Sequence, residues 1–539
     1  MNRNNLAMLA TVTVVLVALV FVTFRSNEPE VEAGLPDQPE GITEILPVVA
    51  TPNIVFIIWD TTRADRLSAY GHSVDTTPYL RDFAKEAVLY ERAVAPGMWT
   101  LPSHAAMFTG LPVSAHGANS SRKWLDNRFL TMAEWFKEQG YGTYLFSPNG
   151  YVSDVTNLHQ GFDQVDHPWD RRWSATTEAA TAKKIIPTDK STTASPLFEG
   201  ALIKSGGSRN TTKDAGKVAR DAVLQWVDTH SAAPFFVVVN YMETHVPRLP
   251  SLASRQALFD DDLIEEQLEL NQAFGNMLAY TCGMHEYSPH ELEVIRSTYD
   301  AAIRDLDLVT GSLLDSLDER GILDNTVVVI TSDHGEQLGE HHLIGHKYSV
   351  YEPLIRVPLI IRYPQRLAPQ RISSEVNTLD LFATMADLAG IPMAEGTMSK
   401  SLVDPTESSK PITELVAATP RALSRVSKVF PQLEWKPFLR TYTSIEKDGL
   451  KVIINNEGLV ELYNLHQDPL ESQNLANERP QQARELLDSI EAWKSTFDVY
   501  DPAQGDEVIV KGKDKAVRQQ LEALGYLDEW EDEDKGEDY

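Results

Sequence analysis

Continuous apolar runs of strand length recur along the chain from about residue 53 onwards. They are rich in Val and Ile and do not alternate with polar residues, which is typical of strands buried on both faces. Sheets made of such strands are mostly parallel and lie between layers of helices. The runs that fit best are Asn53 to Trp59, Tyr141 to Phe146, Pro234 to Tyr241, Asn325 to Thr331 and Val357 to Arg362.

Amphipathic stretches lie between these runs and predict the helices that cover the sheet. Pro78 suits an early helical turn, and Gly140 and Gly321 suit helix ends. The alternation predicts an α/β fold with a mostly parallel central sheet flanked by helices. The expected helical stretches are Asp82 to Val88, Arg128 to Gln139, Ala215 to Asp228, Glu291 to Glu319 and Asn377 to Leu388.

The pattern changes towards the end of the chain and becomes typical of a smaller α+β subdomain. We expect strands over Lys451 to Asn455 and Leu459 to Leu465, separated by a turn, and then a helix over Pro480 to Trp493. The globular part is therefore divided into a main domain over 51–430 and a C-terminal subdomain over 431–500. An acidic tail over 501–539 follows it.

An uncharged, almost wholly apolar run of 19 residues extends from Leu6 to Phe24. Its length is close to the ~20 residues that a helix needs to cross a bilayer. Arg3 precedes the run and several glutamates follow it, which favours an outward-facing body. We therefore predict a single-pass anchor over 1–27, a linker over 28–50 and an extracytoplasmic globular part, either periplasmic or extracellular. A cleaved signal peptide is the alternative, although the run is longer than a usual signal core.

The composition limits the partners and the kinds of metal site. The 78 acidic residues exceed the 48 basic ones, and the net charge of -30 repels polyanions, so no nucleic acid partner is expected. Cys282 is the only cysteine, so the chain forms no intrachain disulfide and no zinc site built from several cysteines.

Thr100 lies in a dense cluster of small and turn-forming residues that extends from Ala95 to Gly110. Pro102 suits the first turn of a helix, so Thr100 is expected just before a helix N-terminus. Free N–H groups and the helix dipole stabilise an oxyanion, a phosphate or a sulfate at such a place. The alternative is that Thr100 only caps the helix.

Polar residues follow three of the predicted strands. Asp60 follows the first, Thr244 and His245 come soon after the third, and Asp333 with His334 follows the fourth. In parallel sheets ligands bind at the carboxyl ends of the strands, where these residues meet. A carboxylate beside an imidazole is typical of a metal site, although an isolated Asp-His pair is more often a turn. Asp60 strengthens the metal hypothesis because the sheet can gather all three side chains.

Several motifs occur in the order seen in sulfatases, a branch of the alkaline phosphatase superfamily. From about residue 51 to 500 the chain resembles this family. The motifs are Asn53 to Asp60, Thr100-Leu-Pro-Ser-His104, Thr109-Gly110, Ser332-Asp-His-Gly335 and Glu340-His341.

The resemblance implies a metal-dependent ester hydrolase with a sulfatase-like catalytic domain. It implies that Asp60, Asp333 and His334 hold a divalent ion, with Thr100 as a further ligand and as the nucleophile. This set of oxygen and nitrogen ligands favours Ca, Mg or Mn over Zn. One metal is expected, and a second remains an alternative.

Five further residues receive roles from the resemblance or from their neighbourhood. His245 is similar to the histidine that protonates the leaving group, and Lys347 is similar to the lysine that contacts the transferred group. The candidate substrate-binding residues are His104, Asn149 and His346.

The chain departs from the sulfatase pattern at the nucleophile. Thr100 stands where sulfatases have a cysteine or serine that becomes formylglycine, an aldehyde that threonine does not supply. Nearby, His104 replaces an arginine, Thr61 replaces a metal-binding aspartate, and Ser147-Pro-Asn-Gly150 replaces a common Gly-Lys-Trp-His.

A plain threonine occurs in related phosphodiesterases, phosphonate hydrolases and phosphoryl-group transferases. We therefore expect cleavage of phosphate (di)esters or phosphonate esters. Sulfate ester hydrolysis, phosphoryl transfer to an alcohol and an inactive binding protein are the alternatives. The substrate is expected to be a small-molecule, lipid or glycan ester, and the insertions at about 170–213 and 243–290 carry no motif that identifies it.

Overall fold

The computed structural model describes residues 51–184, 215–270, 274–416, 436–505 and 520–521. The predicted anchor over 1–27, the linker over 28–50 and most of the acidic tail lie outside these residues. Within the described ranges, no helix combines the length and apolar character needed to cross a membrane.

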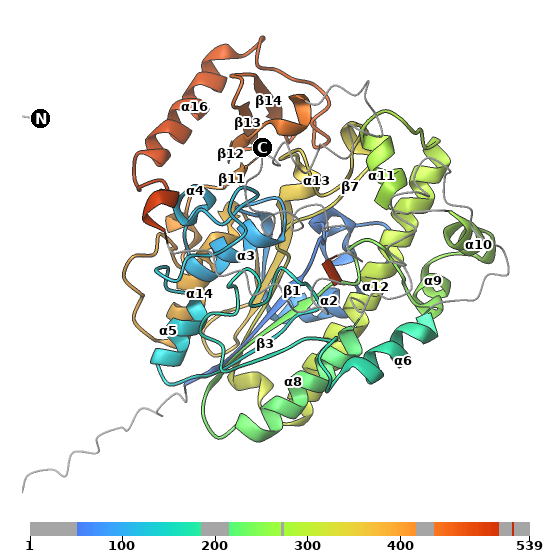
Figure 1. Cartoon of the computed structure of the whole chain (residues 1–539), viewed down its shortest axis with the longest axis vertical. Helices are drawn as coiled ribbons and strands as arrows, with labels where there is room; N and C mark the ends of the chain where they lie inside the picture. Colours follow the sequence, from blue (N-terminus) through green and yellow to red (C-terminus); the bar gives the residue numbers. More distant parts are fainter. Residues whose placement is uncertain (1–50, 185–214, 271–273, 417–435, 506–519, 522–539) are drawn as a thin grey trace, which may run out of the picture. The chain divides into compact units, whose positions relative to one another are not determined.

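An eight-stranded sheet forms the centre of the main domain (Figure 1), with the strand order β10-β2-β9-β6-β1-β5-β3-β4. Seven strands run in the same direction, and β9 alone is antiparallel to its two neighbours, β2 and β6. The sheet is therefore mostly parallel, as predicted. The bounds are β1 Asn53–Trp59, β2 Val88–Val94, β3 Gly142–Phe146, β4 Gln164–Asp166, β5 Phe235–Tyr241, β6 Thr326–Thr331, β9 Arg356–Arg362 and β10 Gln370–Asn377.

The register of the three central strands positions the candidate catalytic residues. Ile57 of β1 pairs with Val239 of β5 on one side and with Ile330 of β6 on the other. All three strands run in parallel, so their carboxyl ends reach the same edge of the sheet. Asp60 and Asp333 follow β1 and β6 at this edge.

Alternate residues of β1 belong to two different hydrophobic cores. Ile54, Phe56 and Ile58 pack in the core that contains α3 (Thr100–Thr109), α5 (Met132–Glu138) and α14 (Leu381–Ala389). Val55 and Ile57 lie in the opposite core with α8 (Gly216–His230) and α12 (Pro289–Glu319). Burial on both faces explains why the strand sequence does not alternate.

The remaining elements of the main domain are short. The helices are α2 (Pro78–Phe83), α4 (Val113–His116), α6 (Ser174–Lys184), α9 (Leu252–Leu258), α10 (Asp261–Glu269), α11 (Phe274–Thr281) and α13 (Glu352–Ile355). A two-stranded hairpin pairs β7 (Gln337–Leu338) with β8 (Ile344–Gly345). The expected helix over Asp82 to Val88 is wrong at its end: helical structure stops at Glu86, and Val88 begins β2.

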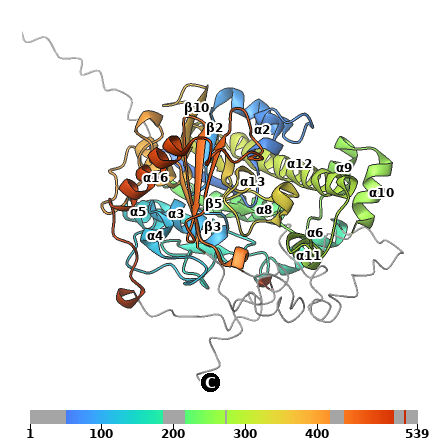
Figure 2. The same ribbon diagram turned by 90° about the horizontal axis from the view of Figure 1, so that it is seen from above.

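A four-stranded antiparallel sheet with one long helix makes up the C-terminal subdomain. Helix α16 packs on this sheet (Figure 2) through a small core that includes Val452, Leu462 and Leu486. The strand β11 comes from before residue 431, so the sheet takes its first strand from the segment that we assigned to the main domain. The bounds are β11 Ile412–Leu415, β12 Tyr442–Lys447, β13 Leu450–Asn455, β14 Val460–Asn464 and α16 Pro480–Lys494.

A buried ion-pair cluster joins this subdomain to the main domain. The ammonium of Lys451 in β13 lies 3.0 Å from a carboxylate oxygen of Glu352 and 2.7 Å from one of Glu471. Glu471 also accepts a hydrogen bond from the backbone N–H of Glu352. Burial raises the pKa of Glu471 to about 7, because Lys451 offsets only part of the cost of a second buried carboxylate.

Candidate active site

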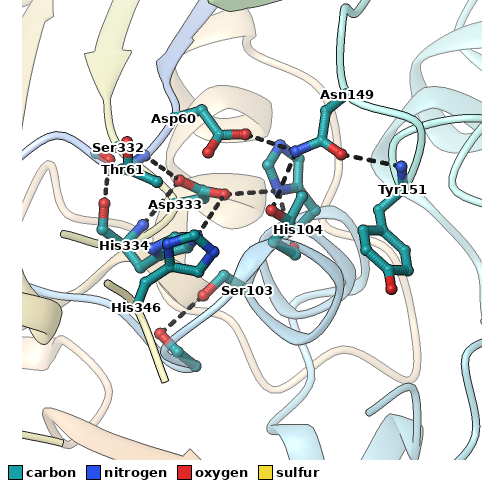
Figure 3. Close-up of polar contacts among 12 residues, drawn as sticks. Asp60, Thr61, Ser103, His104, Asn149, Tyr151, Ser332, Asp333, His334 and His346 are labelled. Carbon is teal, nitrogen blue, oxygen red and sulfur yellow. Dashed lines mark hydrogen bonds and ion pairs between the residues drawn. The ribbon is translucent and has the colours of Figure 1, made fainter. Parts of the chain in front are cut away.

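Asp60, Asp333 and His334 lie together at the carboxyl edge of the sheet. Each offers one ligand atom, and these atoms all lie within 4.8 Å of one another. All three residues are fully buried. Figure 3 shows the three side chains turned towards a common space, with Asn149 and His104 beside it. The structure thus brings together residues that are far apart in the sequence.

Each of these residues presents one buried polar atom without a hydrogen-bond partner among the described residues. The atoms are Asp60 Oδ1, Asp333 Oδ2 and His334 Nε2. The other ring nitrogen of His334, Nδ1, donates to the carbonyl of Gly335 at 2.9 Å, so Nε2 carries the lone pair. Buried polar atoms are nearly always paired, and three of them at one point fit a divalent cation.

Electrostatics at this cluster support the same interpretation. Burial and the charge of Asp333 raise the pKa of Asp60 to about 8, and burial raises the pKa of Asp333 to about 7. Burial also lowers the pKa of His334, which keeps its ring neutral. A cation would compensate both carboxylates and restore their charged forms.

Thr100 is the first residue of α3, and its side chain does not cap the helix. The N-cap position is Trp99, without a side-chain hydrogen bond to the helix. The Thr100 hydroxyl oxygen instead accepts a hydrogen bond of 3.1 Å from Asn149 Nδ2, so the interpretation of Thr100 as a mere N-cap is wrong.

Asn149 links Thr100 to the candidate metal site. The same Nδ2 donates to Asp60 Oδ2 at 2.8 Å. The hydroxyl of Thr100 and this carboxylate oxygen are therefore at most the sum of the two distances apart, about 6 Å. Asn149 Oδ1 accepts from the N–H of Tyr151 at 2.9 Å, which fixes the orientation of the amide (Figure 3).

His104 reaches the site from the next turn of α3. Its Nδ1 donates to the carbonyl of Thr100 at 3.0 Å and lies 3.4 Å from Asp333 Oδ2. Burial lowers the pKa of His104 to about 3, so the ring is neutral. His104 therefore brings no positive charge to the place where sulfatases are expected to have an arginine.

A row of histidine rings extends from the candidate metal site. The ring of His346 lies 4.8 Å from that of His334 and 4.9 Å from that of His245, centroid to centroid. His245 Nδ1 donates to the carbonyl of Val246 at 2.6 Å. Lys347, the next residue after His346, is half-buried. The roles of His245 and Lys347 stay predictions.

Three buried residues around the site were not predicted from the sequence. Glu336 accepts a hydrogen bond from Arg248 at 2.8 Å, and its other oxygen lies 3.1 Å from His346 Nδ1. Asn240, the penultimate residue of β5, directs its amide to Asp60 Oδ2 at 3.4 Å. Two features of the sequence could have identified them. Asn240 lies near a strand end, and Glu336 follows His334 by two residues.

Comparison with known proteins places this geometry in a family. The model of the family described as "Sulfatase" matches residues 52–391, which is more than half of the chain. The chain belongs to the sulfatase family. A second model, "N-sulphoglucosamine sulphohydrolase, C-terminal", matches residues 339–495 and thus includes β12 to β14 of the C-terminal subdomain.

Curated relatives of this sulfatase-family chain are distant but extend over much of its length. It is 23% identical to an N-acetylgalactosamine-6-O-sulfatase of Bacteroides thetaiotaomicron, over 82% of this chain and 93% of the relative. It is 24% identical to arylsulfatase K of Canis lupus familiaris, over 65% of this chain and 66% of that relative. The prediction of an ester hydrolase of this family is therefore confirmed.

Solved structures share the fold. A phosphonate monoester hydrolase of Agrobacterium radiobacter superposes with a TM-score of 0.64 at 21% identity, over 82% of this chain and 95% of that structure. A phosphonate monoester hydrolase of Silicibacter pomeroyi gives 0.65 at 18% identity, over 83% and 96%. The predicted sulfatase-like fold with a mostly parallel sheet and a C-terminal subdomain is confirmed.

Proposed function

We propose that this sulfatase-family hydrolase cleaves phosphate (di)esters or phosphonate esters with Thr100 as its nucleophile. The observation that carries the proposal is the shared amide of Asn149, which holds the Thr100 hydroxyl beside Asp60. Among the described residues no acceptor takes the hydroxyl proton of Thr100, so the group is positioned but not consumed by structural bonding.

The chain's own groups assist attack by Thr100. The hydroxyl of Thr100 loses its proton to solvent water and its oxygen attacks phosphorus, so an O–P bond to the threonine forms as the bond to the leaving oxygen breaks. Asn149 donates to the attacking oxygen, and the first turn of α3 adds N–H groups and a positive dipole end. A divalent cation held by Asp60, Asp333 and His334 would supply positive charge that favours the threonine alkoxide and the oxygens of the transferred group.

Departure of the leaving group needs a proton, which we assign to His245. Its Nδ1 donates to the carbonyl of Val246, so the imidazolium form carries the transferable proton on Nε2 and becomes neutral when the leaving oxygen takes that proton. Water then attacks the phosphothreonine and gives its proton to His245, the O–P bond to Thr100 breaks, and the threonine oxygen regains a proton from solvent. The released product is a phosphate monoester from a diester, phosphate from a monoester, or a phosphonate. An alcohol in place of water would make the same site a transferase.

The atoms that would bind the metal determine which ion we propose as the cofactor. Two carboxylate oxygens and one imidazole nitrogen suit Ca, Mg or Mn better than Zn.

We also propose that the enzyme is anchored by its N-terminal apolar run, with the hydrolase part outside the cytoplasm. Removal of residues 1–27 should then release activity from the membrane fraction, and unchanged membrane association would refute the anchor.

Sulfate ester hydrolysis is the second candidate, because the curated relatives are named as sulfatases. Both candidates use the same residues and differ in the atom that Thr100 attacks. A threonine offers no aldehyde hydrate that could expel sulfate, and this favours phosphorus.

Paired substrates and intact-protein mass spectrometry test the proposal. The purified chain, loaded with Mg, Mn or Ca, is assayed on an aryl sulfate, an aryl phosphodiester and an aryl phosphonate ester with the same leaving group. We expect turnover of the phosphorus esters and a mass increase that maps to Thr100 in quenched samples. Thr100→Ala should abolish both, whereas Thr100→Ser, which keeps a hydroxyl, should retain turnover. Exclusive sulfate release, or full activity of Thr100→Ala, would overturn the proposal.

A further inference from the structure

A cavity of about 240 Å³ lies between the segment 341–351 and the C-terminal subdomain. Tyr348 lines it, two residues after His346, whose ring contacts that of His334. Because consecutive Cα atoms are about 3.8 Å apart, the Cα atoms of Tyr348 and His346 are within about 8 Å of each other. The segment 341–351, which supplies much of the cavity wall, therefore also reaches the candidate active site through His346, and none of the proposed catalytic residues lines the cavity.

Aromatic rings form a large part of the cavity wall. His341 stacks on Tyr351 with the ring centroids 3.8 Å apart, and Tyr348 meets Phe438 edge to face at 4.9 Å. Tyr442, from β12, adds a further ring. Aromatic rings gathered around one small space favour a cation, because the face of each ring is the negative part of a quadrupole.

One carboxylate completes the wall. Glu461, from β14, accepts hydrogen bonds from the hydroxyls of Tyr351 at 2.9 Å and Tyr463 at 2.6 Å. Both bonds go to Oε2, and in the described part of the chain no hydrogen bond reaches Oε1. The two phenols thus fix the carboxylate and leave one oxygen for a ligand.

The side chains that line the cavity carry a net negative charge, and Arg440, which bonds the hydroxyl of Tyr442, is itself paired with Glu457 at 2.9 Å. Neither lysine nor arginine is among its lining side chains, and Glu461 is its only carboxylate within the described residues. Burial lowers the pKa of His341, so this ring is uncharged at neutral pH. A negative wall repels sulfated or other anionic sugars and attracts a cation.

The backbone around the cavity is held in an unusual conformation. His341, His342 and Tyr348 have φ angles of 52°, 59° and 72°, in the left-handed region that side chains rarely adopt. Such conformations persist where the surroundings fix them, and they occur often at ligand clamps. The backbone that carries the rings of His341 and Tyr348 is therefore held in place by its surroundings.

We propose that this cavity binds a quaternary ammonium group of the substrate. Its volume is below the about 300–1,000 Å³ typical of sites for drug-sized ligands, which fits a small headgroup better than an oligosaccharide. The evidence for this binding site is the aromatic wall and Glu461, and it does not depend on the proposed function. Its use in catalysis rests on the proposed function, and together they identify a phosphodiester with a trimethylammonium headgroup as the substrate class.

Binding of choline to the full-length chain tests the site by calorimetry. The control ligand is 3,3-dimethylbutan-1-ol, which has the shape of choline without its charge. We expect choline to bind at least roughly tenfold more tightly, the effect of about 1.4 kcal/mol of cation–π and charge attraction. Equal affinities, no choline binding, or tighter binding of a neutral methyl glucoside would overturn the proposal.

Two variants and a matched control locate the binding. Glu461→Gln keeps an acceptor for the two phenols but removes the charge, and Phe438→Leu removes one ring from a half-buried position. Both should weaken choline binding at least several-fold, whereas Glu485→Gln, an exposed charge on α16, should not. Wild-type affinity in Glu461→Gln would contradict the assignment.

The same measurement in Thr100→Ala separates this proposal from the proposed function. Choline should bind this variant as it binds the wild type, because no catalytic group lines the cavity. Choline binding combined with exclusive sulfate ester hydrolysis would refute the phosphorus chemistry and keep the site. Phosphodiester cleavage without choline binding would refute the choline site and keep the phosphorus chemistry.

Discussion

Divalent metal binding should release protons, because the carboxyl groups of Asp60 and Asp333 are held in their neutral forms in the metal-free protein. Burial raises the pKa of Asp333 to about 7, and burial together with the charge of Asp333 raises the pKa of Asp60 to about 8. A cation binds the ionised forms, so each carboxyl that is protonated beforehand must lose its proton. The perturbation is removal of metal by a chelator, followed by titration with Mg, Mn or Ca at several pH values.

The pKa values set the size of the effect. Near pH 6 almost all of both carboxyl groups are protonated, so binding should release roughly two protons, whereas at about pH 9 it should release about 0.1. Near pH 6 the apparent affinity should be about 10³-fold weaker than at high pH, since Asp60 contributes about two units and Asp333 about one. The affinity should stop changing above about pH 9.

Calorimetry in pairs of buffers with different ionisation enthalpies counts the released protons. In Asp333→Asn only one carboxyl group remains to titrate, so the count near pH 6 should fall to about one or less, together with the affinity. A proton count near zero at pH 6 in the wild type would refute the reasoning, because it would mean that both carboxylates are ionised without a cation.

The same shifts determine how the stability of the metal-free protein depends on pH. A folded pKa above the unfolded value of 3.8 means that stability is full below that value and is lost as the pH rises towards about 8. In the presence of a chelator, the urea concentration at the midpoint of unfolding should therefore decrease between about pH 4 and 8. Saturating metal should abolish this decrease, since the bound protein keeps both groups ionised at either pH.

Three further substitutions follow from the geometry. Asn149→Ala should lower kcat by about 10²-fold with a smaller change in KM, because it removes one donor to the attacking oxygen of Thr100, and steady-state kinetics on the best phosphorus ester would show it; a change confined to KM would contradict this role. Lys451→Met should lower the unfolding free energy by about 3–5 kcal/mol in urea, since it leaves two buried carboxylates unpaired, and a loss below about 1 kcal/mol would contradict the cluster's importance. Gly335→Ala should weaken metal binding, measured by calorimetry, because a Cβ there would collide with the backbone carbonyl of Pro353, which the Glu336 N–H already fixes; unchanged affinity would show that the turn can shift.

The parts of the fold that follow from the sequence are those in which one residue type decides the environment. An uninterrupted Val and Ile run can only lie between two apolar layers, so β1, β5 and β6 could be predicted to within a residue. The edge strand β10 could not, because half of its residues are exposed and polar and nothing distinguishes them from a loop. The strand β2 was missed for a related reason, since Glu91 and Arg92 interrupt its apolar run.

The candidate site likewise has residues that could be predicted from the sequence and residues that could not. Asp60, Asp333 and His334 could be predicted to converge because they follow parallel neighbouring strands, whose carboxyl ends the register brings to the same edge of the sheet. The pairing of Arg248 with Glu336 could not, because it depends on how two loops fold over the strand ends. A loop side chain carries no periodicity, so the sequence gives no sign of which partner it will meet.

Asn149 shows why the unpredicted contacts matter for the chemistry. Sulfatase motifs suggested only that the common lysine and histidine are absent from the 147–150 segment, which by itself would indicate a weakened site. The structure shows instead that an amide fills the space and reaches Thr100 and Asp60 at once. An amide cannot neutralise the transferred group as a lysine would, so in the proposed mechanism more of that charge would fall on the cation and on His245. An enzyme arranged in this way should depend on its metal more steeply than a relative that keeps the lysine, and Asn149→Lys should reduce that dependence if the space admits the longer side chain.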